Sequence, residues 1–70
     1  MEDSNKRLTK RELQVVKLIA KDLKYREIAD ELGLGYETVK TYATRIRRKL
    51  GVNSKVAVAL WAIKQGAEDA

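Results

Sequence analysis

The chain contains no cysteine, no histidine and no proline among its 70 residues. Without cysteine it can form neither a disulfide nor a thiolate metal site, and without histidine it lacks the usual general base and the commonest metal ligand. We therefore expect no catalytic residues, no metal and no cofactor. The longest apolar run, Val56 to Ile63, has eight residues, well short of the roughly 20 that cross a bilayer. Because a signal-peptide pattern is also missing, we expect a cytoplasmic protein without a membrane partner.

Short sequence patterns predict where the helices begin and end. Thr9 and Glu12 have capping-box spacing, in which the side chain of each accepts a hydrogen bond from the backbone N–H of the other. Glycine is scarce, with 4 residues, and the abundance of Ala, Leu, Lys, Glu and Arg favours helices whose breaks are set by the glycines. We predict an all-α fold of four helices, at about residues 9–21, 25–32, 36–50 and 54–65. The domain is expected to span residues 8–66, between a flexible tail at 1–7 and a frayed end at 67–70.

The spacing of apolar residues assigns an inner face to the helices. The first helix is expected to bury a stripe of Leu13, Val16, Ile19, Ala20 and Leu23. Val15 and Leu18 are expected to widen this buried stripe. The helix at 36–50 is expected to bury Val39, Tyr42, Ala43, Ile46 and Leu50. Its opposite side then carries Glu37, Lys40, Thr41, Thr44, Arg45 and Arg48.

Positive charge is concentrated in one segment of the chain. The whole sequence has 15 basic and 10 acidic residues, a net charge of +5 and a pI of ≈ 9.7. Residues 35–50 hold five basic residues against one acidic residue and so carry +4 of that charge. Charge alone leaves two interpretations open, a solvated helix face or an element that binds a polyanion.

Residues 25–44 have the spacing of a helix-turn-helix, the motif whose second helix enters the major groove of DNA. With Tyr25 as the first of twenty positions, the small fifth residue is Ala29, and the ninth, which needs a positive φ, is Gly33. The apolar residues required at the fourth, eighth, tenth and fifteenth positions are Ile28, Leu32, Leu34 and Val39. All six constrained positions fit, and the basic segment follows at once. The sequence therefore predicts a nucleic-acid-binding domain.

Several spaced motifs also resemble one known family. They are Leu8-Thr9-Lys10-Arg11-Glu12, Leu18-Ile19-Ala20, Glu27-Ile28-Ala29-Asp30-Glu31-Leu32, Thr38-Val39-Lys40, Ile46 and Lys49-Leu50-Gly51-Val52. Over about residues 8–65 the chain resembles the LuxR-type DNA-binding domain, which includes FixJ, NarL and GerE-like proteins. The resemblance implies a four-helix domain that binds promoter DNA as a dimer, with the third helix in the major groove and the fourth paired with its mate.

The resemblance further implies roles for individual side chains. Lys40, Thr41 and Thr44 are the expected base contacts, because a lysine can donate to guanine O6 or N7 and a threonine can meet a thymine methyl or donate one hydrogen bond. Glu37 either accepts from cytosine N4 or only favours the helix N-terminus. Thr38 resembles the phosphate-contacting threonine of the family. Their charge makes four residues of the third helix further expected phosphate contacts, namely Arg45, Arg47, Arg48 and Lys49. At the starts of elements, Lys24, Arg26 and Lys55 either contact phosphate or serve only solubility.

The last helix has apolar residues on two sides. At about 100° per residue, one face, expected to pack inward, consists of Val56, Ala59, Leu60 and Ile63. The opposite face consists of Ala57, Val58, Trp61 and Ala62. An amphipathic helix needs only one apolar face, so the second face, together with Gln65, predicts a homodimer interface. Alternatively, Trp61 folds back onto the first helix.

Together these features predict a transcriptional regulator, or the effector domain of one, that binds specific double-stranded DNA, with RNA polymerase as a further candidate partner. The rival interpretation is a module resembling sigma region 4 that docks on RNA polymerase. That rival predicts no duplex binding and a flat salt dependence, whereas phosphate binding releases counterions and is strongly salt-dependent. An enzyme is disfavoured, because the sequence has no clustered set of Asp, Glu, Lys or Tyr and no glycine-rich phosphate loop.

Overall fold

The computed structural model describes residues 8–65, and within that range it contains helices and no strand. The elements are α2 (Lys10–Ala20), α3 (Tyr25–Leu32), α4 (Tyr36–Leu50) and α5 (Lys55–Gln65). The all-α prediction is confirmed, and the bounds predicted for α3 and α4 match the structure. The predicted tail at 1–7 and frayed end at 67–70 lie outside the described residues.

The first helix begins at the predicted capping box. The Thr9 Oγ1 accepts from the Glu12 N–H at 3.1 Å, and the Thr9 N–H donates to Glu12 Oε1 at 2.8 Å. The buried stripe of α2 includes Val15, Val16 and Ile19 as predicted, but Leu13 departs from the prediction because it is 36% exposed. The side chains that face the core follow i, i+3, i+4, i+7 spacing from position 12, which turns position 13 toward solvent.

Two of the three helix breaks are made by glycine, as predicted. Gly33 (φ +67) ends α3 and Gly51 (φ +72) ends α4, both in the left-handed region that a residue with a Cβ rarely adopts. The break after α2 differs from the prediction, because its left-handed residue is Asp22, with φ 68. The short polar side chain of aspartate tolerates this conformation better than most others do. After Gly51, only residues 52–54 separate α4 from α5.

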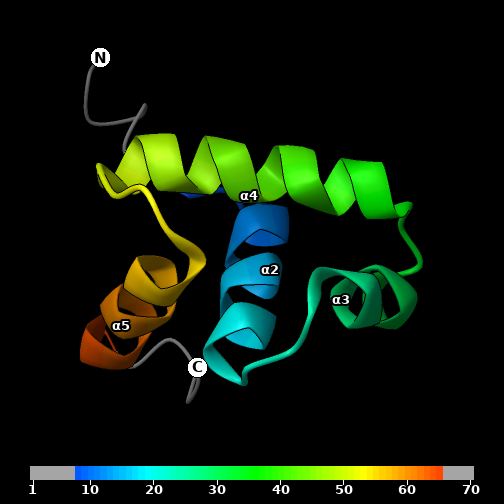
Figure 1. Cartoon of the computed structure of the whole chain (residues 1–70), viewed down its shortest axis with the longest axis horizontal. Helices are drawn as coiled ribbons and strands as arrows, with labels where there is room; N and C mark the ends of the chain where they lie inside the picture. The colour runs from blue at the N-terminus through cyan, green and yellow to red at the C-terminus, as the bar shows by residue number, and fades with distance from the viewer. Residues whose placement is uncertain (1–7, 66–70) are drawn as a thin grey trace.

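The core receives side chains from every described helix. Figure 1 shows α4 along one side of the molecule, with α2, α3 and α5 together on its other side. The most extensive packing joins α2 to α5 and α3 to α4. The buried apolar residues are Val15, Val16, Ile19, Ile28, Ala29, Val39, Ala43, Ile46, Val58 and Ala62. Each buried valine or isoleucine stabilises the fold by roughly 1.5–3 kcal/mol relative to an exposed one.

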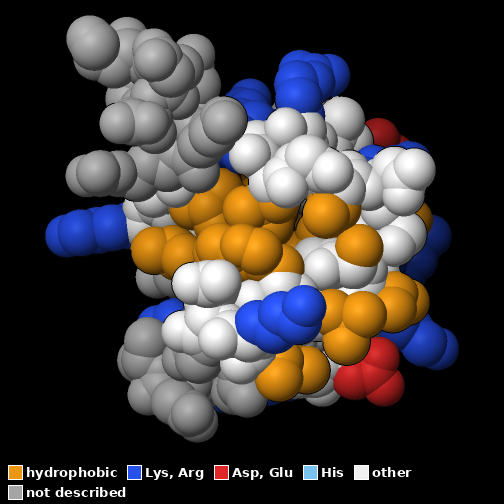
Figure 2. Space-filling view, turned by 90° about the vertical axis from the view of Figure 1, so that its left-hand side faces the viewer, with side chains coloured by type: hydrophobic (Ala, Val, Ile, Leu, Met, Phe, Trp, Pro, Cys, Tyr) orange, Lys and Arg blue, Asp and Glu red, His pale blue; other side chains and the backbone are white. Residues whose placement is uncertain are grey.

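Helix α5 packs with the face opposite to the one predicted. Ser54 caps it, since its Oγ accepts from the Ala57 N–H at 3.0 Å. Val58 and Ala62 are buried in the core, at 1% and 0% exposure, whereas Val56, Leu60 and Ile63 are exposed, at 67%, 56% and 52%. Seen from the side of the molecule where α5 lies, apolar side chains cover much of the surface (Figure 2).

The predicted dimer residues on α5 are therefore corrected. Val58 and Ala62 belong to the monomer core, and Trp61 is half-buried against the same core. Ala57 is also half-buried, so Gln65 alone of the predicted set is exposed. The physical reason is that α5 is apolar all round, so its own periodicity does not decide which side faces α2. The alternative, in which Trp61 folds back, agrees better with its burial.

Candidate nucleic-acid interface

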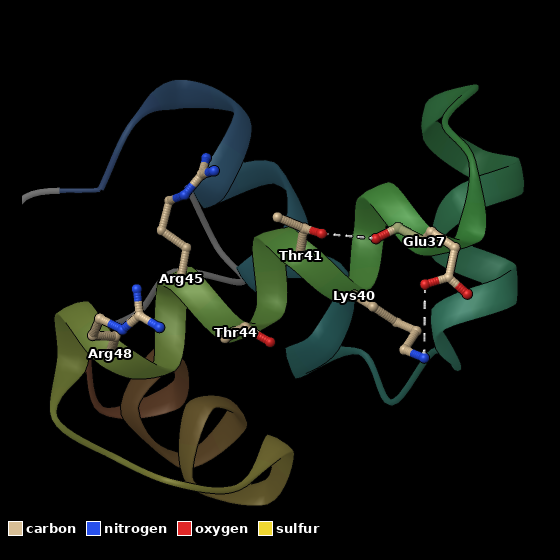
Figure 3. A pocket seen from close by; sticks show the side chains of 6 residues that line it. All are labelled: Glu37, Lys40, Thr41, Thr44, Arg45 and Arg48. Atoms are coloured by element: carbon tan, nitrogen blue, oxygen red, sulfur yellow. Dashed lines mark hydrogen bonds and ion pairs between the residues drawn. The ribbon is translucent and has the colours of Figure 1, made fainter.

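The outer face of α4 gathers the side chains that the sequence placed there. Glu37, Lys40, Thr41, Thr44, Arg45 and Arg48 are all exposed and together line a shallow hollow of ≈ 360 Å³. Figure 3 shows them along one side of the helix, with both arginines at its C-terminal half. The opposite side of α4 buries Val39, Ala43 and Ile46. The predicted division of α4 into an inner and an outer face is confirmed.

The N-terminal half of this face holds three of the four base-contact candidates, Glu37, Lys40 and Thr41, in a connected arrangement. The Lys40 Nζ lies 3.9 Å from Glu37 Oε1, and both side chains are well exposed, at 48% and 84%. The Thr41 hydroxyl donates to the Glu37 carbonyl oxygen at 3.1 Å. An exposed ion pair of this kind contributes little, so Lys40 can exchange Glu37 for another acceptor.

Of the phosphate candidates of α4, Arg45 and Arg48 line the outer face itself, and Thr38 and Arg47 lie beside it on opposite flanks. The Arg45 Cζ sits 5.7 Å from the centre of the Tyr42 ring. Thr38 shares a second hollow of ≈ 160 Å³ with Thr41, Tyr42 and Arg45. On the other flank, Arg47 donates from Nη1 to the Tyr25 hydroxyl and from Nη2 to Thr44 Oγ1, each at 3.3 Å. These contacts orient arginine groups beside the face that carries the base-contact candidates.

Lys49 differs from the prediction that it contacts phosphate. Its ammonium lies 2.9 Å from Glu12 Oε1, and its side chain is only 19% exposed. Position 49 follows the buried Ile46 by three residues, which places it on the inner edge of α4, toward α2. Lys49 therefore links α4 to α2 through an ion pair and does not belong to the outer face of α4.

Glu12 is the buried partner of that ion pair. Burial raises the pKa of its carboxyl. The hydrogen bond from the Thr9 N–H and the nearby Lys49 ammonium together lower this pKa by more than burial raises it, so the net pKa lies below the ordinary value of 4.5. Its Oε2 atom is buried and has no hydrogen-bond partner among the described residues 8–65. The ionised carboxylate thus depends on Oε1, which receives both Thr9 and Lys49.

The remaining basic candidates stand at the starts of α3 and α5. Lys24 is exposed at the N-cap of α3, where its backbone N–H donates to Glu27 Oε1 at 2.7 Å. The Arg26 Cζ lies 4.6 Å from the centre of the Tyr36 ring, and the Lys55 Nζ lies 5.1 Å from that of Tyr25. These three cations extend the positive surface beyond α4.

Two tyrosines have roles that the sequence analysis did not identify. Tyr25 receives Arg47 at its hydroxyl and Lys55 at its ring, and Tyr36 has Arg26 and Lys40 at its ring. The i, i+4 spacing from Tyr36 to Lys40 was a usable signal. The contact between Tyr36 and Arg26 crosses the turn between α3 and α4, so spacing within one helix could not reveal it.

No group of three or more acidic, histidine or cysteine residues within 8–65 is arranged to hold a metal ion. Of the helices in that same part of the chain, none is long and apolar enough to span a membrane.

Comparisons with known proteins show which family the chain matches. Residues 6–62 match the family described as bacterial regulatory proteins, luxR family. The chain is 43% identical over 63 residues to the response regulator GacA of Pseudomonas aeruginosa, and 41% identical over 63 residues to the oxygen regulatory protein NreC of Staphylococcus aureus. Each alignment covers 90% of this chain but 29% of the relative, so the chain spans less than a third of the length of either protein.

The family match covers most of the chain, and it coincides with the helix-turn-helix spacing and with the exposed basic face of α4. The chain belongs to the LuxR family of bacterial regulatory proteins, a family of DNA-binding transcriptional regulators and not of enzymes.

Proposed function

We propose that the chain binds specific sequences of double-stranded promoter DNA by placing α4 in the major groove. The observation that carries this proposal is the hollow on α4, where six exposed polar or charged side chains lie together on one face. Helix α4 lies along one side of α2, α3 and α5 (Figure 1), and its buried residues Val39, Ala43 and Ile46 are not among these six side chains. The major groove of B-DNA, about 12 Å wide, admits a helix presented in this way.

Within that interface we assign the base contacts to the first nine residues of α4, up to Thr44. Lys40 donates to guanine O6 or N7, and Thr41 and Thr44 meet thymine methyls or single acceptors. Glu37 lies beside Lys40 and is placed to accept from cytosine N4. The exposure of these side chains and their position on α4 support these roles. Phosphate contacts fix the register of the protein on DNA, whereas base contacts determine which DNA sequence it recognises.

The phosphate contacts surround the base-contact residues on several elements. Arg45 and Arg48 extend the outer face of α4 toward its C-terminus. The flanking members of the set are Thr38, Arg47, Lys24, Arg26 and Lys55. Because they come from three helices, they support a clamp on the DNA backbone on both sides of the groove. Their summed charge gives an affinity that falls steeply with salt.

We further propose that the chain pairs with a second copy through the exposed side of α5. Val56, Leu60 and Ile63 recur at i, i+4 and i+7, which forms a continuous apolar stripe. Val56 and Leu60 also line a groove of ≈ 360 Å³, whose other lining residues are Ile19, Ala20, Ala59, Asp22 and Lys55. A two-fold axis lets each copy place its stripe against that of the other, and so buries both. The exposed Gln65 lies at the end of the same helix.

Selection of bound duplexes from a random-sequence pool tests the proposal directly. The expected product is an inverted repeat whose half-sites contain a guanine, with a fixed spacing set by the dimer. Binding of the enriched duplex should weaken strongly as salt rises. Failure to enrich any sequence, with weak and salt-independent duplex binding, would overturn the proposal and favour docking on RNA polymerase instead.

A further inference from the structure

Tyr36 occupies a junction between the two helices of the helix-turn-helix. It is the first residue of α4, and its ring is half-buried. The Arg26 Cζ from α3 lies 4.6 Å from the ring centre, and the Lys40 Nζ from the next turn of α4 lies 5.3 Å from it. Both distances are within the roughly 6 Å at which a cation is attracted to an aromatic face.

The two cations differ in what else restrains them. Lys40 has an exposed carboxylate partner in Glu37, at 3.9 Å, and its own side chain is 48% exposed. Arg26 is exposed on α3, and among residues 8–65 its contact across the turn is with the Tyr36 ring. Long basic side chains lose much conformational freedom when they bind, so a ring that holds them beforehand reduces this cost.

The ring also solves an electrostatic problem. Two positive groups brought to one place repel each other, and the protein surface screens this repulsion only in part. The negative face of an aromatic ring attracts each of them, and the Glu37 carboxylate offsets part of their charge. Tyr36 can therefore hold a cation from α3 and a cation from α4 at the same end of the interface.

We propose that Tyr36 is a positioning residue for DNA recognition, whose ring holds Lys40 toward a guanine edge and Arg26 toward an adjacent phosphate. This inference rests on the proposed function, because it needs α4 in the major groove. It adds that one aromatic ring couples a base contact to a backbone contact. The phenol hydroxyl has no part in it, so a phenylalanine should serve as well.

The test compares Tyr36→Leu, which removes the ring, with Tyr36→Phe, which keeps it. The probes are the duplex that the wild-type chain enriches from a random pool and a scrambled duplex of the same length. Tyr36→Leu should lower affinity for the enriched duplex about five- to tenfold and for the scrambled duplex less. Tyr36→Phe should stay within about twofold of wild type, and thermal melting should verify that both variants fold.

Double variants show whether the ring acts through its two cations. Tyr36→Leu combined with Lys40→Ala should lose less affinity than the product of the single losses, and the same should hold with Arg26→Ala. Arg48→Ala lies three turns further along α4 and provides the matched control, whose effect should multiply with that of Tyr36→Leu. A general loosening of the fold would not distinguish among these partners.

A spectroscopic measurement on the free chain adds an independent readout. In the wild type and in Tyr36→Phe, ring currents should shift the Arg26 side-chain protons upfield, and Tyr36→Leu should abolish that shift. Equal losses of affinity in Tyr36→Phe and Tyr36→Leu, or multiplicative effects with both Arg26→Ala and Lys40→Ala, would overturn the role of Tyr36. Absence of any enriched duplex for the wild type would instead overturn the proposed function.

Discussion

Helices α4 and α5 each pack one face into the same core, but their outer faces have opposite chemistry. The outer face of α4 carries Lys40, Arg45 and Arg48 around two threonines and a glutamate. The outer face of α5 carries Val56, Leu60 and Ile63, each more than half exposed. A charged face remains hydrated at little cost, whereas a contiguous apolar patch on so small a domain marks a surface that another molecule covers.

Under the proposed function, this contrast corresponds to two different kinds of partner. A polyanion suits the first face, and a second apolar surface suits the other. Salt should therefore weaken the affinity of the α4 face for its partner and leave that of the α5 face nearly unchanged, because burial of apolar area does not depend on charge screening. The following experiments test this division, beginning with the contact that holds α4 in place.

The outer face of α4 stays exposed only if α4 is held against α2. The ion pair of Glu12 with Lys49 joins these two helices and is the contact to break. Glu12→Gln should lower the free energy of unfolding by about 3 kcal/mol at pH 7, because it leaves the ammonium opposite a neutral amide. Urea unfolding followed by circular dichroism measures this loss. The exposed carboxyl variant Glu31→Gln is the control, and an equal loss in both variants would contradict the role of the pair.

The same variant should flatten the acid dependence of stability. The folded-state pKa of Glu12 lies below its ordinary value of 4.5, so its contribution is complete above that pH and disappears as pH falls through the folded-state pKa. The difference in unfolding free energy between wild type and Glu12→Gln should thus shrink below pH 4.5. A difference that stays constant down to strongly acidic pH would refute the pKa shift.

Leu60→Glu should separate the two faces most clearly. A charge in the middle of the apolar stripe should prevent self-association and reduce affinity for an inverted repeat on the order of a hundredfold, because two linked half-sites bind with avidity. Affinity for a single half-site should change little. Sedimentation velocity and fluorescence anisotropy measure the two effects. Leu13→Glu places the same charge at another exposed leucine, on α2, and should leave the dimer intact.

Lys40→Ala tests base recognition on the outer face of α4. Loss of one base contact should cost about 1–3 kcal/mol of binding free energy for the enriched duplex and relax the preference at one base pair. Competition with duplexes varied at each position measures the preference. Equal weakening of enriched and scrambled duplexes would show that Lys40 contacts phosphate and not a base.

Arg48→Ala should have the smallest and most uniform effect. A lost phosphate contact should weaken binding to all duplexes alike and lower the slope of log affinity against log salt by about one. Titrations over a range of salt concentrations give the slope. A changed base preference in this variant would move Arg48 into the set that reads sequence.

The outer face of α4 could be predicted from the sequence, and that of α5 could not. In α4, polar and apolar residues alternate with helical period, so Lys40 and Val39 could be assigned to opposite sides without knowledge of any other helix. In α5, Val58 and Leu60 are equally apolar, and only packing against α2 buries the first and exposes the second. Periodicity carries information about orientation only where the two faces differ in polarity.

Contacts between distant residues explain the other differences. Lys49 was expected on the DNA surface because its charge matches that of its neighbours, but its partner Glu12 lies 37 positions earlier in the chain. The cap role of Glu12 was visible locally, whereas its second role required the packing of α4 on α2. Asp22 differs for another reason, because glycine adopts a positive φ far more readily than aspartate and is therefore the usual sequence signal for a left-handed turn.

The turn at Gly51 has a consequence for measurement of distance along DNA. This single left-handed residue and the three that follow it fix the angle between the helix proposed to read bases and the helix proposed to pair with its mate. In the proposed dimer, the conformation of this turn would therefore set the distance between the two copies of α4. Inserting one residue among 52–54 should change that distance, so that the chain selects half-sites of unchanged sequence at a different spacing.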